Sequence, residues 1–102
     1  MLDIILEFRK GILFIRLKGD LNKDTIKGII DKDFKYVVLN IDDMYSIDSY
    51  SIKYLNKIYK LYENNNNKFI ICDKFNVSRK LLRDIPKINR EYDAFELFER
   101  MI

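Results

Sequence analysis

The chain has 102 residues, enough for one domain with a modest hydrophobic core. Its 19 basic and 16 acidic residues are mixed along the sequence and leave a net charge of +3, which argues against a basic stripe that binds nucleic acid. No apolar run approaches the ~20 residues that a membrane-spanning helix requires. We therefore expect a globular protein that neither binds nucleic acid nor inserts into a membrane.

The residue types that most often hold metals are scarce. The chain has no histidine and one cysteine, Cys72, so an internal disulfide is excluded and a zinc site of the usual kind is disfavoured. We expect no metal and no cofactor. A lone cysteine fits a reducing compartment, and the N-terminus lacks the basic start and cleavage site of a signal peptide. These features favour a cytoplasmic protein.

The first predicted elements are two strands joined by a tight turn. Residues 2–8 alternate in hydropathy and place four apolar side chains on one face: Leu2, Ile4, Leu6 and Phe8. Residues 9–11 form the turn, and residues 12–17 form the second strand, which Gly19 and Asp20 should end. The pattern predicts an antiparallel hairpin.

A helix is predicted next, from about residue 23 to residue 30. Asn22 can cap this helix, and the apolar residues Leu21 and Ile26 flank the cap as a hydrophobic staple does. Residues 36–41 then form an almost continuous apolar run, which is typical of a strand covered on both faces. A turn holding Asp42, Asp43 and Asp48 should follow this strand.

The second half of the chain alternates helices and strands. We expect a helix from Ser49 to about Glu63, a strand over 68–72, a short helix over 77–82, a weak strand over 88–92 and a last helix over 94–101. The asparagines of 64–67 suit a loop. The chain is thus predicted to be one α/β domain over 1–102, with a mixed sheet of four to five strands and about four helices.

Ser49 is the most informative residue because it lies where a buried strand gives way to a helix. A hydroxyl there is exposed and close to the unpaired amides of the first helical turn. Either Asp48 or Ser49 could cap the helix. Ser49 could also accept a phosphate, which adds about −1.5 to −2 charges at neutral pH. The two roles are compatible.

Catalysis is a weaker interpretation of the same region. Asp42, Asp43 and Asp48 could bind Mg²⁺, but aspartates at such positions more often cap turns and helices. Nucleotide-binding glycine motifs are absent, and Ser49 has no histidine base. We expect that the protein is not an enzyme and has no catalytic residues.

Three segments resemble the STAS domain of bacterial anti-sigma factor antagonists. Residues 15–22, IRLKGDLN, are similar to the family's R-L-x-G-[ED]-L-[DN]. Residues 37–49, VVLNIDDMYSIDS, are similar to its V-L-[ND]-L-x-x-[LV]-x-[FY]-[ILM]-D-S, and this piece is the most specific. Residues 70–72 followed by 77–82 resemble its late strand and short helix.

The resemblance implies a STAS-like fold and a protein-binding function. Antagonists of this family sequester an anti-sigma factor that is also a serine kinase, and so free a sigma factor for transcription. The kinase phosphorylates the serine after the motif's aspartate, the complex dissociates, and a phosphatase resets the switch. Carried over, Ser49 is the phosphorylation site. The implied partner-binding residues are Asp20, Asn22, Asp48, Ser49, Tyr50 and Ser51.

The residues after Ser49 depart from the family pattern D-S-[ST]-G. Tyr50 stands where a small hydroxyl residue is usual, and Ser51 replaces the glycine. An aromatic at this position is more similar to scaffold-type STAS proteins. The alternative function is therefore a structural subunit of a stress-signalling or lipid-transport complex without a phospho-switch. Ser51 and Ser46 are further candidate acceptors.

Overall fold

Two residues with positive φ, Lys10 and Gly11, join the first two strands in the computed structural model, which describes residues 1–26, 34–76 and 82–101. Strand β1 (Leu2–Arg9) pairs antiparallel with β2 (Ile12–Leu21). The φ angles of 51° and 83° are those of the two-residue turn whose twist matches the flanking strands. The predicted N-terminal hairpin is confirmed.

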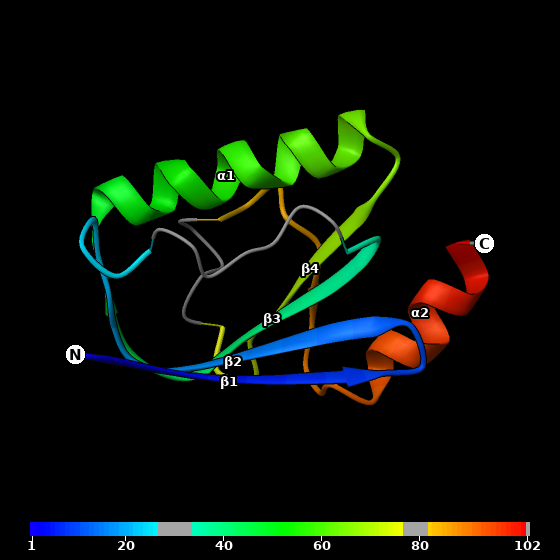
Figure 1. Cartoon of the computed structure of the whole chain (residues 1–102), viewed down its shortest axis with the longest axis horizontal. Coiled ribbons are helices and arrows are strands. Elements are labelled where there is room, and N and C mark those ends of the chain that lie inside the picture. The colour runs from blue at the N-terminus through cyan, green and yellow to red at the C-terminus, as the bar shows by residue number, and fades with distance from the viewer. Residues whose placement is uncertain (27–33, 77–81, 102) are drawn as a thin grey trace.

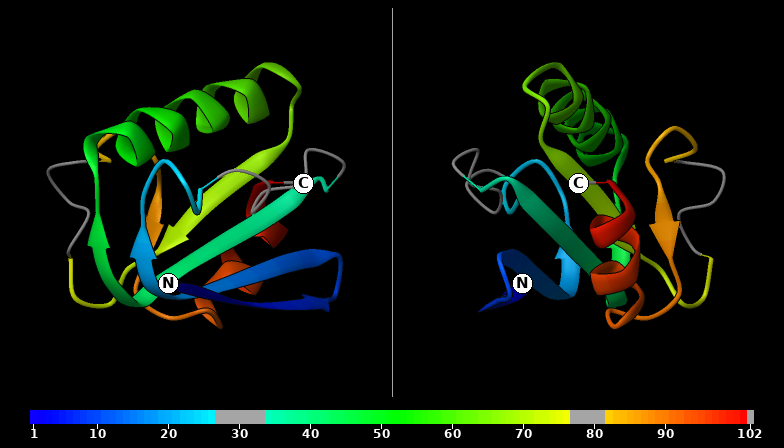
Figure 2. Two further views of the ribbon diagram at one scale, coloured as in Figure 1. Left: turned by 60° about the vertical axis from the view of Figure 1, so that its left-hand side comes forward. Right: turned by 90° about the vertical axis from the view of Figure 1, so that its right-hand side faces the viewer.

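The sheet has the order β1-β2-β3-β4-β5, and every pairing except β1–β2 is parallel. Its remaining strands are β3 (Tyr36–Ile47), β4 (Lys68–Cys72) and β5 (Lys87–Ile88). Helix α1 (Ser49–Asn64) lies across one face of the sheet, and the shorter α2 (Asp93–Met101) lies on the other (Figure 1). In both views of Figure 2, α1 again lies above the sheet. The predicted α/β fold with a mixed sheet is confirmed.

Side chains of the central strands alternate between two apolar clusters, one on each face. The cluster under α1 combines side chains of three strands with Leu55 and Tyr62 of the helix; its strand members include Ile15, Leu17, Leu39, Ile41 and Ile71. The cluster under α2 contains Phe14, Val38, Ile70, Ala94 and Phe98. Burial on both faces explains the continuous apolar run at 36–41, as predicted.

Strands β2 and β3 are longer than the sequence predicts. The predicted ends at residues 17 and 41 are wrong, because β2 continues to Leu21 and β3 to Ile47. The pairing register shifts twice, and each shift leaves one extra residue on β3. These bulges keep the strands paired while interrupting the regular alternation. The predicted turn at Asp42 and Asp43 is therefore part of a strand.

Two of the four predicted helices, α1 and α2, occur in the part of the chain that the structure describes. Residues 27–30 of the helix expected over 23–30, and 77–81 of the helix expected over 77–82, lie outside the described residues. Residues 22–26 form a turn, in which the Ile26 amide donates to the Asn22 carbonyl at 2.8 Å. The strand predicted over 88–92 is wrong: β5 ends at Ile88, because the chain then turns into α2.

Candidate functional site

Asp48 caps helix α1. Its backbone is extended, and its Oδ1 accepts a hydrogen bond from the Ser51 amide at 2.8 Å. This amide, above all, lowers the pKa of the Asp48 carboxyl because it stabilises the charged form. The sequence left open whether Asp48 or Ser49 is the cap. The structure assigns the cap to Asp48 and makes Ser49 the first helical residue.

Asp48 also joins the start of α1 to the segment that follows β2. Its Oδ2 accepts a hydrogen bond from the Lys23 amide at 3.1 Å, and its own amide donates to the Leu21 carbonyl at 3.1 Å. One side chain therefore holds two segments together that are 25 residues apart in the sequence. The position of Ser49 relative to this neighbouring loop follows from these bonds.

The neighbouring loop is stabilised by short-range hydrogen bonds of its own. Asn22 Oδ1 accepts from the amides of Asp24 at 2.9 Å and Thr25 at 3.2 Å. The Thr25 hydroxyl donates to the Asp20 carbonyl at 2.9 Å. Asn22 thus begins a turn through its side chain, as a capping residue does, and fixes the loop beside Asp48.

Asp20 is tied to the end of β3. The Ser46 hydroxyl donates to Asp20 Oδ1 at 2.7 Å, and Asp20 and Ser46 are paired residues of the parallel β2–β3 ladder. The second register shift lies immediately before this pair and makes Tyr45 the extra residue of β3. Tyr45 is 71% exposed.

The Ser49 side chain is exposed, as is that of Tyr50. The Tyr50 ring stacks on Tyr54, with ring centroids 6.4 Å apart and an interplanar angle of 20°. Ser51 is fully buried, and its Oγ has no hydrogen-bond partner within the described part of the chain. It therefore lies apart from the surface residues around Ser49. We call these residues the acceptor surface and define it by the exposed Ser49 and Tyr50 and the half-buried Asp20, Asn22 and Asp48.

The aspartates of the alternative magnesium site are not gathered. Asp42 Oδ1 accepts from the Lys74 amide at 2.7 Å, whereas Asp43 pairs with Lys18 along the β2–β3 ladder. Within residues 1–26, 34–76 and 82–101, no three acidic, cysteine or histidine side chains are grouped as metal ligands. In the same residues, no helix combines the length and apolar character needed to cross a bilayer.

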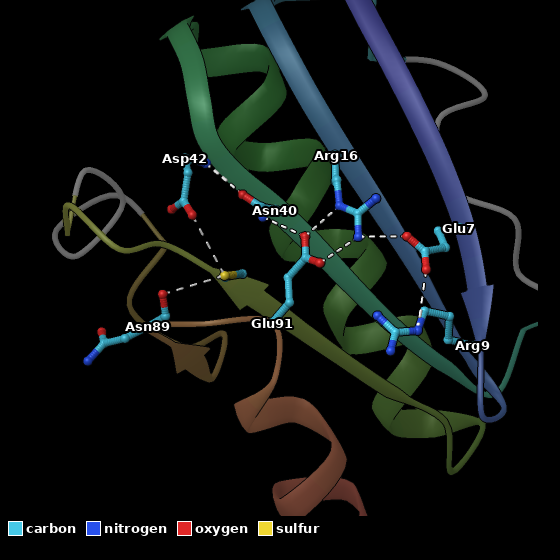
Figure 3. Close-up of polar contacts among 8 residues, drawn as sticks. Glu7, Arg9, Arg16, Asn40, Asp42, Asn89 and Glu91 are labelled. Atoms are coloured by element: carbon cyan, nitrogen blue, oxygen red, sulfur yellow. Dashed lines mark hydrogen bonds and ion pairs between the residues drawn. The ribbon is translucent and has the colours of Figure 1, made fainter.

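A second polar cluster lies on the α2 face of the sheet, and sequence reasoning did not predict it. Arg16 donates from Nε to Glu91 Oε2 at 2.8 Å and from Nη2 to Glu91 Oε1 at 2.7 Å (Figure 3). Asn40 Nδ2 donates to Glu91 Oε2 at 2.6 Å, and Glu7 forms an ion pair with Arg16 at 2.9 Å. Glu91 precedes α2, so these contacts attach the start of that helix to β2 and β3.

The charges of this cluster stabilise one another. Hydrogen bonds from Arg16 are the main reason why the pKa of Glu91 lies below its usual value, although burial opposes the change. The bond to Glu91 likewise raises the pKa of Arg16. Since each group already has its partner, the cluster is suited to structural support.

Cys72 lies at the margin of this cluster. Its Sγ is 4.0 Å from Asp42 Oδ2 and 3.8 Å from the Asn89 carbonyl oxygen (Figure 3). Burial, followed by the nearby carboxylates, raises the pKa of the thiol to about 12. A buried thiol that stays protonated at neutral pH is a poor nucleophile.

No family model and no curated protein matches the chain. Solved structures of the same fold do match it. The anti-sigma factor antagonist SpoIIAA in its unphosphorylated form aligns with a TM-score of 0.71 and 16% sequence identity, over 98% of this chain and 100% of SpoIIAA. An anti-sigma factor antagonist from Mycobacterium paratuberculosis aligns with a TM-score of 0.76 and 13% identity, over 97% of this chain and 95% of that one.

An uncharacterised Shewanella loihica protein described as having a SpoIIAA-like fold also aligns, with a TM-score of 0.61 and 10% identity, over 94% of this chain and 92% of that one. The chain therefore has the SpoIIAA-like fold, in agreement with the fold that the sequence resemblance implies. These alignments span almost the whole of the chain and of each compared protein.

Proposed function

We propose that this chain is an anti-sigma factor antagonist, a binding module that is switched by phosphorylation of Ser49. In its unmodified form it sequesters an anti-sigma factor that is also a serine kinase. The observation that carries the proposal is the exposed Ser49 side chain at the first residue of α1, held beside the Asp20–Asn22 segment by Asp48. The likeness in fold to anti-sigma factor antagonists supports the assignment.

The first helical residue can carry a phosphate without unfolding the domain. The helix dipole places partial positive charge at this end of α1, and an anion there is stabilised. The added charge would stand next to the Asp48 carboxylate, which the Ser51 and Lys23 amides already engage. A partner docked over the acceptor surface would therefore meet a concentration of negative charge, and binding would weaken.

The proposed role makes Ser49 the substrate of another protein's catalysis. The chain itself would act without a cofactor in the cytoplasm, and a phosphatase that recognises the phosphoserine would restore binding. The acceptor surface would supply the contacts for both enzymes. Ser51 is left out of this surface because its side chain is buried.

The test is to locate the phosphate. The full chain is incubated with ATP and extract of the host cell, and the modified residue is identified by mass spectrometry. We expect phosphate on Ser49, none in Ser49→Ala, and unchanged phosphorylation in the matched variant Ser46→Ala, which removes another exposed hydroxyl near the surface. Absence of phosphate from Ser49 under conditions in which extract kinases are active would favour the scaffold function instead.

A further inference from the structure

Strand β1 forms an edge of the sheet and leaves most of its apolar side chains in solvent, although Leu2 packs against the core. The face predicted to be apolar is indeed one face of the strand, but Ile4 is 42%, Leu6 60% and Phe8 60% exposed. Phe8 contacts Phe34, with ring centroids 5.5 Å apart, and still keeps that exposure. Figure 1 shows β1 along the lower border of the sheet.

Among residues 1–26, 34–76 and 82–101, the backbone groups of β1 without a strand partner belong to these same apolar residues. Met1 and Asp20 continue the antiparallel pairing, and the Asp20 amide donates to the Met1 carbonyl at 3.3 Å. Hydrogen-bonded pairs alternate along an antiparallel ladder, so the odd-numbered residues bond to β2. The amides and carbonyls of Leu2, Ile4, Leu6 and Phe8 therefore point outward from the sheet edge.

The strand carries charged side chains at Asp3, Glu7 and Arg9, but it lacks the backbone features that protect an edge. Its eight residues pair with β2 without a register shift, and they include neither proline nor glycine. Natural edges are commonly blocked by bulges, prolines or short length. A regular, apolar edge with a row of free backbone groups is suited to accept another strand.

We propose that the occupant is a second copy of this chain, with β1 pairing antiparallel to its own symmetry mate around Leu6. In this register Leu6 faces Leu6 of the other copy, and Ile4 faces Phe8. On the opposite face of the strand, Asp3 of each copy lies opposite Arg9 of the other copy. Opposite charges across a strand pair stabilise the pairing. The dimer extends the sheet and keeps both α1 helices on one face.

Charge complementarity selects this register. Two neighbouring registers pair the same backbone groups. The one centred on Ile5 brings Asp3 opposite Glu7 of the other copy, and the one centred on Glu7 brings the two Glu7 side chains opposite each other. Like charges directly opposite each other destabilise a strand pair. Pairing of one strand buries less surface than the ~1,200–2,000 Å² of a stable interface, so we expect an association that depends on concentration.

Cysteine cross-linking tests the contact and its register together. Opposite residues in a hydrogen-bonded antiparallel pair have Cα atoms about 5.5 Å apart, within the range of a disulfide. We expect Leu6→Cys to give a covalent dimer with oxidised glutathione. Ile5→Cys should not, because its symmetry mate is displaced by two residues. The native Cys72 is buried and serves in both variants as an internal control.

The second test exchanges the charges at Asp3 and Arg9. The mass of the protein in solution is measured by sedimentation over a range of protein concentrations. We expect the wild type to rise from 12.4 kDa toward twice that mass. Asp3→Arg should stay monomeric, and the double variant Asp3→Arg with Arg9→Asp should associate again. Leu61→Lys, which changes an exposed leucine on α1, should behave as the wild type does.

A wild type that stays monomeric at every concentration would overturn the proposal, as would cross-linking of Ile5→Cys in preference to Leu6→Cys. Circular dichroism of each variant shows whether it is folded. The residues involved lie outside the acceptor surface, so the dimer and the proposed switch can fail independently.

Discussion

Arg16 and Glu91 are 75 residues apart in the sequence, yet they form two parallel hydrogen bonds of 2.8 and 2.7 Å. Arg16 projects from the middle of β2, and Glu91 lies in the turn before α2. The pair fixes the start of α2 against the sheet, and Asn40 adds a third bond to the same carboxylate. Hydrogen bonds to charged groups that are partly removed from water are the stronger ones.

Removing the Glu91 carboxylate should therefore destabilise the fold. We expect Glu91→Ala to lower the free energy of unfolding by about 2 kcal/mol, since it leaves Arg16 and Asn40 without this acceptor. The measurement is denaturant unfolding followed by circular dichroism. The matched control is Glu7→Ala, which removes a more exposed ion pair to the same arginine and should cost well under about 1 kcal/mol. Equal losses in the two variants would contradict this account.

The same pair makes part of the stability depend on pH. The pKa of Glu91 is lowered in the folded state, chiefly by the bonds from Arg16. The contribution of Glu91 to the free energy of unfolding is complete above the unfolded pKa of about 4.3. It is lost as the pH falls through the lower pKa of the folded state. Glu91→Gln should be less stable than the wild type near neutral pH, and the difference should shrink in acid. Melting temperatures measured across this range would refute the idea if the difference stayed constant.

The cysteine should report on unfolding. Because burial raises the pKa of the Cys72 thiol to about 12, little thiolate is present at neutral pH and reagents cannot reach it. We expect slow alkylation in buffer and rapid alkylation in denaturant, measured by mass spectrometry. Leu61→Cys, at an exposed position of α1, provides the positive control. Alkylation of the native Cys72 at the rate of that control would contradict the burial.

Asp48 should be needed both for the helix and for the loop beside it. Asp48→Ala removes the acceptor of the Ser51 and Lys23 amides, and we expect the melting temperature to fall by a few degrees. Asp48→Asn keeps a side-chain oxygen for the cap and should lose much less. Thermal unfolding distinguishes the two variants. If both lost the same stability, the charge would matter more than the cap.

Much of the fold could be predicted because local pattern determines it. The hairpin follows from alternation and from Lys10-Gly11, and α1 follows from the apolar spacing after Ser49. The apolar run at 36–41 indicated a strand buried on both faces, as the structure has it.

The end of β3 could not be predicted in the same way. Asp42 and Asp43 look like turn residues, but the strand continues because β2 pairs with it beyond two bulges. Bulges are a property of the pair of strands, and a single sequence segment does not reveal them. The bonds between Arg16 and Glu91 were missed for a similar reason, since hydropathy says nothing about which distant charges meet.

The candidate site was predicted in part. Asp48 and Ser49 were both possible caps, and only the extended backbone of Asp48 and its hydrogen bond from the Ser51 amide distinguish them. Ser51 was placed on the partner-binding surface by the motif, but its position on the inner side of the first turn buries it. Which side chains of the first turn face inward depends on the residue at which the helix begins, and a shift of one residue would change them.

The central claim is tested most directly by the affinity of the proposed partner, an anti-sigma factor kinase, for three variants of this chain. Ser49→Asp should bind at least tenfold more weakly than Ser49→Ala, a difference of about 1.4 kcal/mol. Asn64→Asp adds the same charge at the far end of α1, about 22 Å away, and should bind as the wild type does. Equal affinities of Ser49→Asp and Ser49→Ala would contradict a switch at this serine.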